Sequence, residues 1–199
     1  PGELQRLRLA TQIRSQLFGV VYVLDEPSAG LHPADTQALL GALDELKRAG
    51  NSLFVVEHDT SVIWHADWIV DIGPDAGTHG GEVIYSGPLE GLRDVEKSHT
   101  AQFLFGPAAH DAGSKVVAPS ATNHTPRRPT GWLKLTGIER NNLQALDVQF
   151  PLRVLTTVTG VSGSGKSSLV GQALVELVGE ALGQKKTVVE LLMRLMETP

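Results

Sequence analysis

A glycine-rich loop near residue 160 carries the residues best suited to chemistry. Its pattern is G-x-x-x-x-G-K-S, from Gly160 to Ser167. Gly163 and Gly165 let the backbone turn so that successive N–H groups face a phosphate, and the following helix adds its positive N-terminal dipole. Lys166 supplies charge to the β- and γ-phosphates, and the serine after it supplies a ligand for Mg²⁺. The loop therefore predicts a site for a purine nucleoside triphosphate.

The predicted nucleotide-binding residues are those of this loop together with the next serine. They are Gly160, Val161, Ser162, Gly163, Ser164, Gly165, Lys166, Ser167 and Ser168, with Ser167 also predicted as a Mg²⁺ ligand. The apolar strand expected from Val154 to Thr159 leads directly into the loop, and a helix is expected from Lys166 to about Leu182. This order of strand, loop and helix is the context that a phosphate loop requires.

Two carboxylates follow an upstream apolar strand. The run from Val20 to Leu24 is typical of a strand buried on both faces of a parallel sheet. Asp25 at its exit suits a Mg²⁺ ligand, and Glu26 suits a base that orients the attacking water. A second apolar strand, Ser52 to Val56, ends just before His58, which is placed to hydrogen-bond a γ-phosphate. Taken alone, these carboxylates fit a solvated turn equally well, so their surroundings decide the interpretation.

The remaining pattern predicts an α/β fold. A short amphipathic helix is expected over residues 3 to 17, and a longer one begins near Pro33 and stops at Gly50. Further strands are expected at 68–72, 82–85, 132–135 and 146–150. Residues 106 to 130 contain prolines and small polar residues without periodicity, which is typical of a linker.

Composition narrows the function classes. The chain has 17 basic and 22 acidic residues and a net charge of -5, so bulk electrostatics does not predict nucleic-acid binding. The absence of cysteine excludes disulfides and cysteine-ligated zinc within the 199 residues. No apolar run reaches the length of a membrane span, and we expect a cytoplasmic protein without a membrane partner. Both ends are expected to be truncations.

The strand-end residues lie in a motif series that resembles one known superfamily. The series consists of Asp25-Glu26-Pro27-Ser28, a Gly30-Leu31-His32 turn and Val55-Val56-Glu57-His58-Asp59. It resembles the Walker B strand, D-loop and switch histidine of ABC-type ATPases, in which the glycine loop is the Walker A motif. Pro1-Gly2-Glu3-Leu4-Gln5-Arg6 looks like the second half of the ABC signature motif. The resemblance favours ATP over GTP.

Within that superfamily the match narrows to the DNA-repair branch, the UvrA family of excinuclease components. The stretches that look like this family are Arg8 to Ile13, Ile69 to Val83, Leu135-Thr136-Gly137, Asn141-Asn142-Leu143 and Val158 to Leu169. The resemblance as a whole covers about residues 1 to 105 and 131 to 178. Residues 180 to 199 look like a charged helical insertion.

This resemblance implies partial tandem nucleotide-binding domains of the P-loop NTPase class. Residues 1–105 would end a first ATPase half, 106–130 would link, and 131–199 would begin a second half. In such a family each nucleotide lies between the Walker motifs of one half and the signature of the other. Gly2 and Glu3 would then contact the ATP held by Lys166, whereas Asp25, Glu26 and His58 would serve a different ATP. The chain would complete neither site and would not hydrolyse ATP above background.

The family also implies a biological role. The full protein would be an ATPase that binds damaged DNA as a homodimer, uses ATP and Mg²⁺, and passes the lesion to a UvrB-type partner. Zinc is expected elsewhere in that protein, without ligands in this chain. Three alternatives remain open: a UvrA-like paralogue in drug tolerance, an ABC transporter ATPase, and a non-catalytic module from a degenerate gene.

Overall fold

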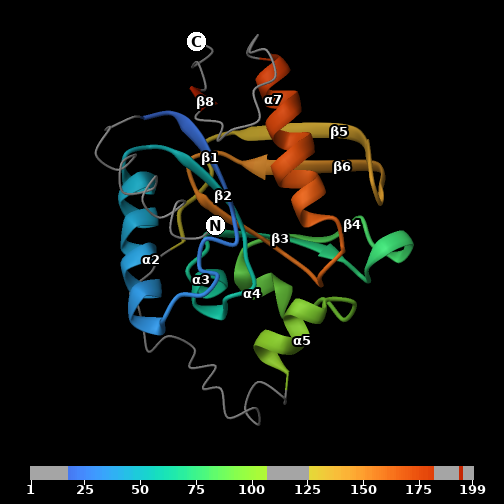
Figure 1. Ribbon diagram of the computed structural model, residues 1–199, viewed down its shortest axis with the longest axis horizontal. Coiled ribbons are helices and arrows are strands. Elements are labelled where there is room, and N and C mark those ends of the chain that lie inside the picture. The colour runs from blue at the N-terminus through green and yellow to red at the C-terminus, as the bar shows by residue number, and fades with distance from the viewer. Residues whose placement is uncertain (1–17, 107–125, 182–192, 195–199) are drawn as a thin grey trace.

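The structure is a computed structural model that describes residues 18–106, 126–181 and 193–194. Its centre is a six-stranded sheet with the strand order β4-β3-β7-β2-β1-β8 (Figure 1). The strands are β1 (Val20–Asp25), β2 (Ser52–Val56), β3 (Trp68–Gly73), β4 (Glu82–Gly87), β7 (Leu155–Thr159) and β8 (Met193–Arg194). Neighbours among β1, β2, β7 and β3 pair in parallel, whereas β4 and β8 are antiparallel edges.

The position of β7 has the largest consequence for the site. This strand comes from the far side of the predicted linker, yet it pairs with β2 on one side and β3 on the other. Because parallel strands end at the same edge of a sheet, Asp25, His58 and Gly160 all lie at or just after strand ends at one edge. The predicted division into 1–105, 106–130 and 131–199 stays a prediction, but the two outer ranges share one sheet here.

Alternating side chains on the central strands contribute to two separate hydrophobic cores. Phe54 and Val56 of β2 join the core that faces the second sheet, while Leu53 and Val55 pack on the opposite face against helix α2 (Pro33–Arg48). All five residues of β2 are buried. This two-sided burial explains why the strand is a continuous apolar run without alternation.

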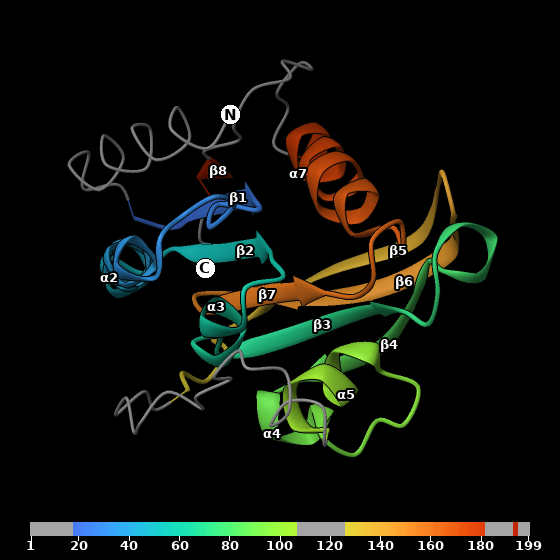
Figure 2. The ribbon, with the colours of Figure 1, turned by 60° about the horizontal axis from the view of Figure 1, so that its bottom comes forward.

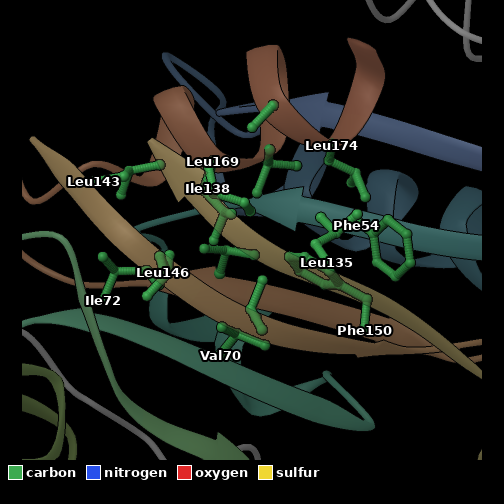
Figure 3. Packing of buried hydrophobic residues seen from close by; sticks show 14 of the residues in the cluster. Phe54, Val70, Ile72, Leu135, Ile138, Leu143, Leu146, Phe150, Leu169 and Leu174 are labelled. Atoms are coloured by element: carbon green, nitrogen blue, oxygen red, sulfur yellow. The ribbon is translucent and has the colours of Figure 1, made fainter. Parts of the chain in front are cut away.

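The larger core lies between the main sheet and a two-stranded antiparallel sheet of β5 (Trp132–Arg140) and β6 (Leu143–Pro151) (Figures 2 and 3). Phe54 and Phe150 meet across it with ring centroids 4.9 Å apart. Leu169 and Leu174 enter it from η2 (Ser168–Leu174), a π-helical segment that α7 (Val175–Ala181) continues. Because Phe150 is fully buried, its truncation to alanine should cost about 3–5 kcal/mol.

Several smaller elements lie between these strands. They are α3 (Thr60–Trp64), a 3₁₀ turn η1 (Gly77–His79), α4 (Leu89–Leu92) and α5 (His99–Phe105). The last two pack with Ile63 and Ile69 in a third core beside β3. Among the helices of the described ranges, none is long and apolar enough to cross a bilayer.

Most predicted strands are confirmed, with β5 and β6 longer than expected. The helix at Pro33 is also confirmed, and the one predicted over 3–17 lies outside the described residues. The helix expected after Lys166 differs, because its first part, Ser168–Leu174, is π-helical. Met193–Arg194 pairs with β1 as a strand, so the helical prediction for the tail is wrong at those residues, and most of that tail lies outside the described residues.

Residues 126–130, the described end of the predicted linker, contact the folded body. The Arg127 N–H donates to Asp67 Oδ1 at 2.9 Å, and its guanidinium donates to the Lys47 carbonyl, also at 2.9 Å. Asp67 in turn accepts from the Leu155 N–H at 2.8 Å. The chain is therefore anchored to the start of β7 before the second sheet begins.

Candidate nucleotide-binding site

The phosphate loop follows β7 and closes on its own lysine. Lys166 is 5% exposed, and its ammonium donates to the carbonyls of Gly160 and Val161 at 2.9 and 2.8 Å. Ser162 and Gly163 lie exposed at the tip, whereas Ser164 is buried and its hydroxyl has no partner within the described residues. The loop thus turns its lysine inward, with the charge held at the centre of the turn.

Two glycines of this loop have no room for a side chain. Gly160 has a φ of 129°, and a Cβ there would lie 1.9 Å from the Ile72 carbonyl oxygen. Gly165 has a φ of 109°, and its Cβ would lie 2.8 Å from a methyl carbon of Leu143. Because both the backbone angle and the space exclude a Cβ, these positions explain why the motif requires glycine.

Main-chain contacts hold the loop from outside. The Gly77 N–H donates to the Gly163 carbonyl at 3.1 Å, and the Gly81 N–H donates to the Ser164 carbonyl at 2.9 Å. The Asn142 amide nitrogen adds a bond of 3.2 Å to Gly163. The 73–81 turn and the Asn142 turn, which sequence resemblance singled out without a role, therefore both support the phosphate loop.

Asp25 lies beside the loop. Partial burial raises the pKa of its carboxyl, as does the neighbouring charge of Glu26, while a hydrogen bond with Ser167 and the charge of Lys166 oppose this. Burial likewise lowers the pKa of Lys166, opposed by Glu26, Asp25 and Asp71. Asp25 and Ser167 are thus neighbours with oxygen donors suited to Mg²⁺. No cluster of three or more metal-binding side chains occurs in the described part of the chain.

Glu26 and His58 face each other across the ends of β1 and β2. The His58 Nε2 atom lies 3.1 Å from Glu26 Oε1, and both side chains are about half exposed, 52% for Glu26 and 48% for His58. Glu26 has a φ of 47°, which is uncommon outside glycine, and its N–H donates to the Val56 carbonyl at 2.9 Å. A carboxylate and a histidine therefore face solvent together at the edge that carries the phosphate loop.

Sequence reasoning missed two buried carboxylates behind this edge. Asp71 is fully buried and accepts from the hydroxyls of Ser98 at 2.6 Å, Thr100 at 2.8 Å and Thr159 at 2.7 Å. Thr159 directly precedes the phosphate loop, so Asp71 fixes the point where the loop begins. The second is Glu57, which is buried and directly follows β2. The available signal was an acidic residue inside or directly after an apolar strand.

The structure brings together most of the predicted site residues. The loop residues 160–168, Asp25, Glu26 and His58 all lie at one sheet edge, whereas Gly2 and Glu3 lie outside the described residues. The insertion of β7 beside β2 places Asp25 and Glu26 close enough to act on the Lys166 charge. The expectation that the acidic residues serve a different nucleotide from the one at Lys166 stays a prediction.

Comparisons with known proteins place this geometry in a family. The chain is 66% identical over 185 residues to UvrABC system protein A of Paucimonas lemoignei, covering 93% of this chain and 26% of that protein. It is 51% identical over 187 residues to UvrABC system protein A of Streptomyces avermitilis, covering 94% and 18%. The chain thus spans about a fifth to a quarter of the length of these relatives. No protein-family model matches it.

A solved structure of a related protein agrees with this family assignment. The crystal structure of UvrA2 from Deinococcus radiodurans is 64% identical and matches 92% of this chain and 21% of its own, with a TM-score of 0.53. These names favour the excision repair family over the transporter alternative. Over the stretch shared with these relatives, the chain belongs to the UvrA family of ABC-type ATPases.

Proposed function

We propose that the shared edge of β7, β1 and β2 binds ATP with Mg²⁺. The observation that carries this proposal is the convergence of the phosphate loop with Asp25, Glu26 and His58, which come from segments far apart in the sequence. A phosphate loop alone binds many nucleotides. A phosphate loop with a strand-end carboxylate pair and a histidine has the parts that phosphoryl transfer to water requires.

Each side chain has a defined part in this proposal. The loop N–H groups and Lys166 hold the phosphates, and Ser167 with Asp25 would hold Mg²⁺, which would offset charge on the β- and γ-phosphates. Glu26 would accept a hydrogen bond from a water molecule and orient it, and His58 beside it would hydrogen-bond the terminal phosphate. Lys166 must first leave the carbonyls of Gly160 and Val161 to reach a phosphate.

At the level of the whole protein, we propose the DNA-damage-recognition ATPase of the UvrABC nucleotide excision repair system. The names and identities of the relatives support this role. Damaged DNA, a UvrB-type partner, a homodimer and zinc sites outside this chain all belong to the same proposal. A cytoplasmic location stays a prediction of the sequence.

The binding proposal is tested by titrating the chain with a fluorescent ATP analogue, with and without Mg²⁺. We expect Mg²⁺-dependent binding that Lys166→Ala weakens at least about 100-fold, because the charge proposed to bind the phosphates is lost. The matched control is Lys134→Ala, which removes an exposed lysine on β5 and should leave the affinity unchanged. Equal weakening by both variants, or no binding by the unmodified chain, would contradict the proposal.

An ATP hydrolysis assay distinguishes two arrangements. In the one-site geometry, Asp25 and Glu26 act on the nucleotide at Lys166, and in the two-site expectation they serve a different nucleotide. If Asp25 and Glu26 serve a different nucleotide, the chain should hydrolyse ATP at the background rate. Measurable phosphate release that Glu26→Gln lowers more than about tenfold, with ATP affinity retained, would instead place Glu26 at the Lys166 nucleotide.

A further inference from the structure

Glu57 is a buried carboxylate between the loops that follow β1 and β2. It is 2% exposed, and its Oε1 atom accepts from the Ser28 N–H at 2.8 Å. Its Oε2 atom accepts from the N–H groups of His58 at 3.0 Å and Asp59 at 3.2 Å. One side chain therefore binds the backbone of both loops.

The charge of Glu57 is stabilised by these N–H groups. Across the described ranges, the ion pairs of lysine, arginine and histidine involve other acids. A buried carboxylate without a cation requires several hydrogen-bond donors to offset its lost hydration. Ser28, His58 and Asp59 provide three such donors, so the two loops and the carboxylate depend on one another.

These contacts close a ring around the catalytic edge. Ser28 is two residues from Glu26, and Glu26 contacts the His58 ring at 3.1 Å. The backbone of His58 returns to Glu57, and Glu57 returns to Ser28. The Glu26 N–H also binds the carbonyl of Val56, which precedes Glu57. A shift of either loop must therefore break at least one bond of the ring.

We infer that Glu57 is a positioning residue that holds Glu26 and His58 at a fixed separation and couples the two loops mechanically. This inference rests on the proposed function for the roles of Glu26 and His58. Glu57 itself does not face the exposed edge, because it is 2% exposed and both of its carboxylate oxygens accept from backbone donors. Its effect on ATP chemistry therefore acts through the two residues that it positions.

The two acceptor oxygens of Glu57 matter as well as its shape. Glutamine has nearly the same size, but its side chain has one oxygen acceptor and an NH₂ group that donates. In Glu57→Gln, either Ser28 or the His58-Asp59 pair of N–H groups must face that NH₂ group. The ring then opens on one side while the apolar packing around β2 is unchanged.

The unmodified chain gives the first test, measured by amide hydrogen exchange without nucleotide. If Glu57 couples the loops, the amides of Ser28, His58 and Asp59 open together, and their exchange rates corrected for local sequence should agree within about threefold. Rates that differ by more than about tenfold would overturn the inference. This measurement needs neither ATP binding nor a variant.

The second test compares Glu57→Gln with Glu26→Gln and with the exposed control Glu82→Gln. In Glu57→Gln, exchange at Ser28 or at His58 should accelerate about tenfold or more. The His58 ring signals in a nuclear magnetic resonance spectrum should move toward their positions in Glu26→Gln, where the carboxylate charge beside the ring is removed directly. Unchanged signals and unchanged exchange would overturn the inference.

Measurements of ATP affinity distinguish a failure of the inference about Glu57 from a failure of the proposed function. Glu57→Gln should retain ATP affinity within about threefold, because the hydrogen bonds of the Glu57 side chain among the described residues go to the loops after β1 and β2 and not to the phosphate loop. If Lys166→Ala fails to weaken ATP binding while the contacts of Glu57 behave as expected, the proposed function fails and the inference about Glu57 is kept. If Glu57→Gln weakens ATP binding as strongly as Lys166→Ala does, Glu57 acts on the phosphate loop and the inference fails.

Discussion

The two sides of the candidate site are held by different kinds of contact. On the acidic side, the loops after β1 and β2 are joined by side chains: Glu57 binds backbone N–H groups, and Glu26 contacts His58. On the phosphate side, the loop is held mainly by main-chain bonds from the 73–81 turn and by glycines without room for a Cβ. The acidic side should therefore respond to side-chain chemistry, and the phosphate side to backbone shape.

Gly160→Ala should give the largest effect, because it tests the backbone side directly. The new methyl group would lie 1.9 Å from the Ile72 carbonyl, at a φ of 129° that alanine avoids. We expect unfolding free energy to fall by more than about 3 kcal/mol and Mg²⁺-dependent ATP binding to disappear. Thermal unfolding and the fluorescent ATP titration measure both effects.

The matched control for this prediction is Gly171→Ala in η2. A Cβ at Gly171 would meet nothing within 4 Å, and its backbone angle is ordinary. Alanine should therefore leave binding intact and stability equal or slightly higher. Comparable stability and affinity in the two variants would mean that backbone shape does not hold the phosphate loop.

Asn142→Ala should give a smaller effect, which sharpens the same contrast. The variant removes one side-chain bond of 3.2 Å to Gly163, while the main-chain bonds from Gly77 and Gly81 remain. We expect a loss of about 0.5–1.5 kcal/mol in stability and less than a tenfold loss in ATP affinity. If Asn142→Ala abolishes ATP binding, the phosphate side also depends on a side chain, and the contrast fails.

The local parts of this site were predictable, and their assembly was not. The phosphate loop carries its information in consecutive residues, so the pattern from Gly160 to Ser167 predicts both strand and turn. The neighbours of β7 depend on which strands it meets in space, and no local periodicity encodes that choice. Glu57 and Asp71 were missed for the same reason, since their donors lie up to 29 residues away for Glu57 and 88 for Asp71.

The comparison with a solved relative bears on how the two segments of the site assemble, which an experiment can test. A TM-score of 0.53 at 64% identity means that the sequences agree more closely than the overall superposition does. The two-site expectation concerns the longer protein, and the one-site geometry is that of this chain. The Glu26→Gln hydrolysis experiment distinguishes them for this chain.

Asp25→Asn should have the smallest effect on stability, and in the stabilising direction. Partial burial raises the pKa of Asp25 above its ordinary value of 3.8, so the folded chain binds this proton more tightly than the unfolded chain does. Stability is therefore lost as pH rises from 3.8 through the raised folded pKa, and the loss is constant above it. Asparagine carries no such charge, so the variant should become more stable than the unmodified chain across this window and stay so at neutral pH.

The function of Asp25 should change in the opposite direction. The introduced asparagine would keep one oxygen beside Ser167 but would lose the charge that attracts Mg²⁺, so the Mg²⁺ dependence of ATP binding should weaken. Because Asp25 remains accessible to solvent, the stability gain should be small, and Asp94→Asn provides the exposed comparison. Thermal unfolding between about pH 3 and pH 8 and Mg²⁺ titrations at fixed ATP measure the two responses. A variant that loses stability at neutral pH would show that Asp25 stabilises the fold, and the acidic side would then be a structural element before it is a metal site.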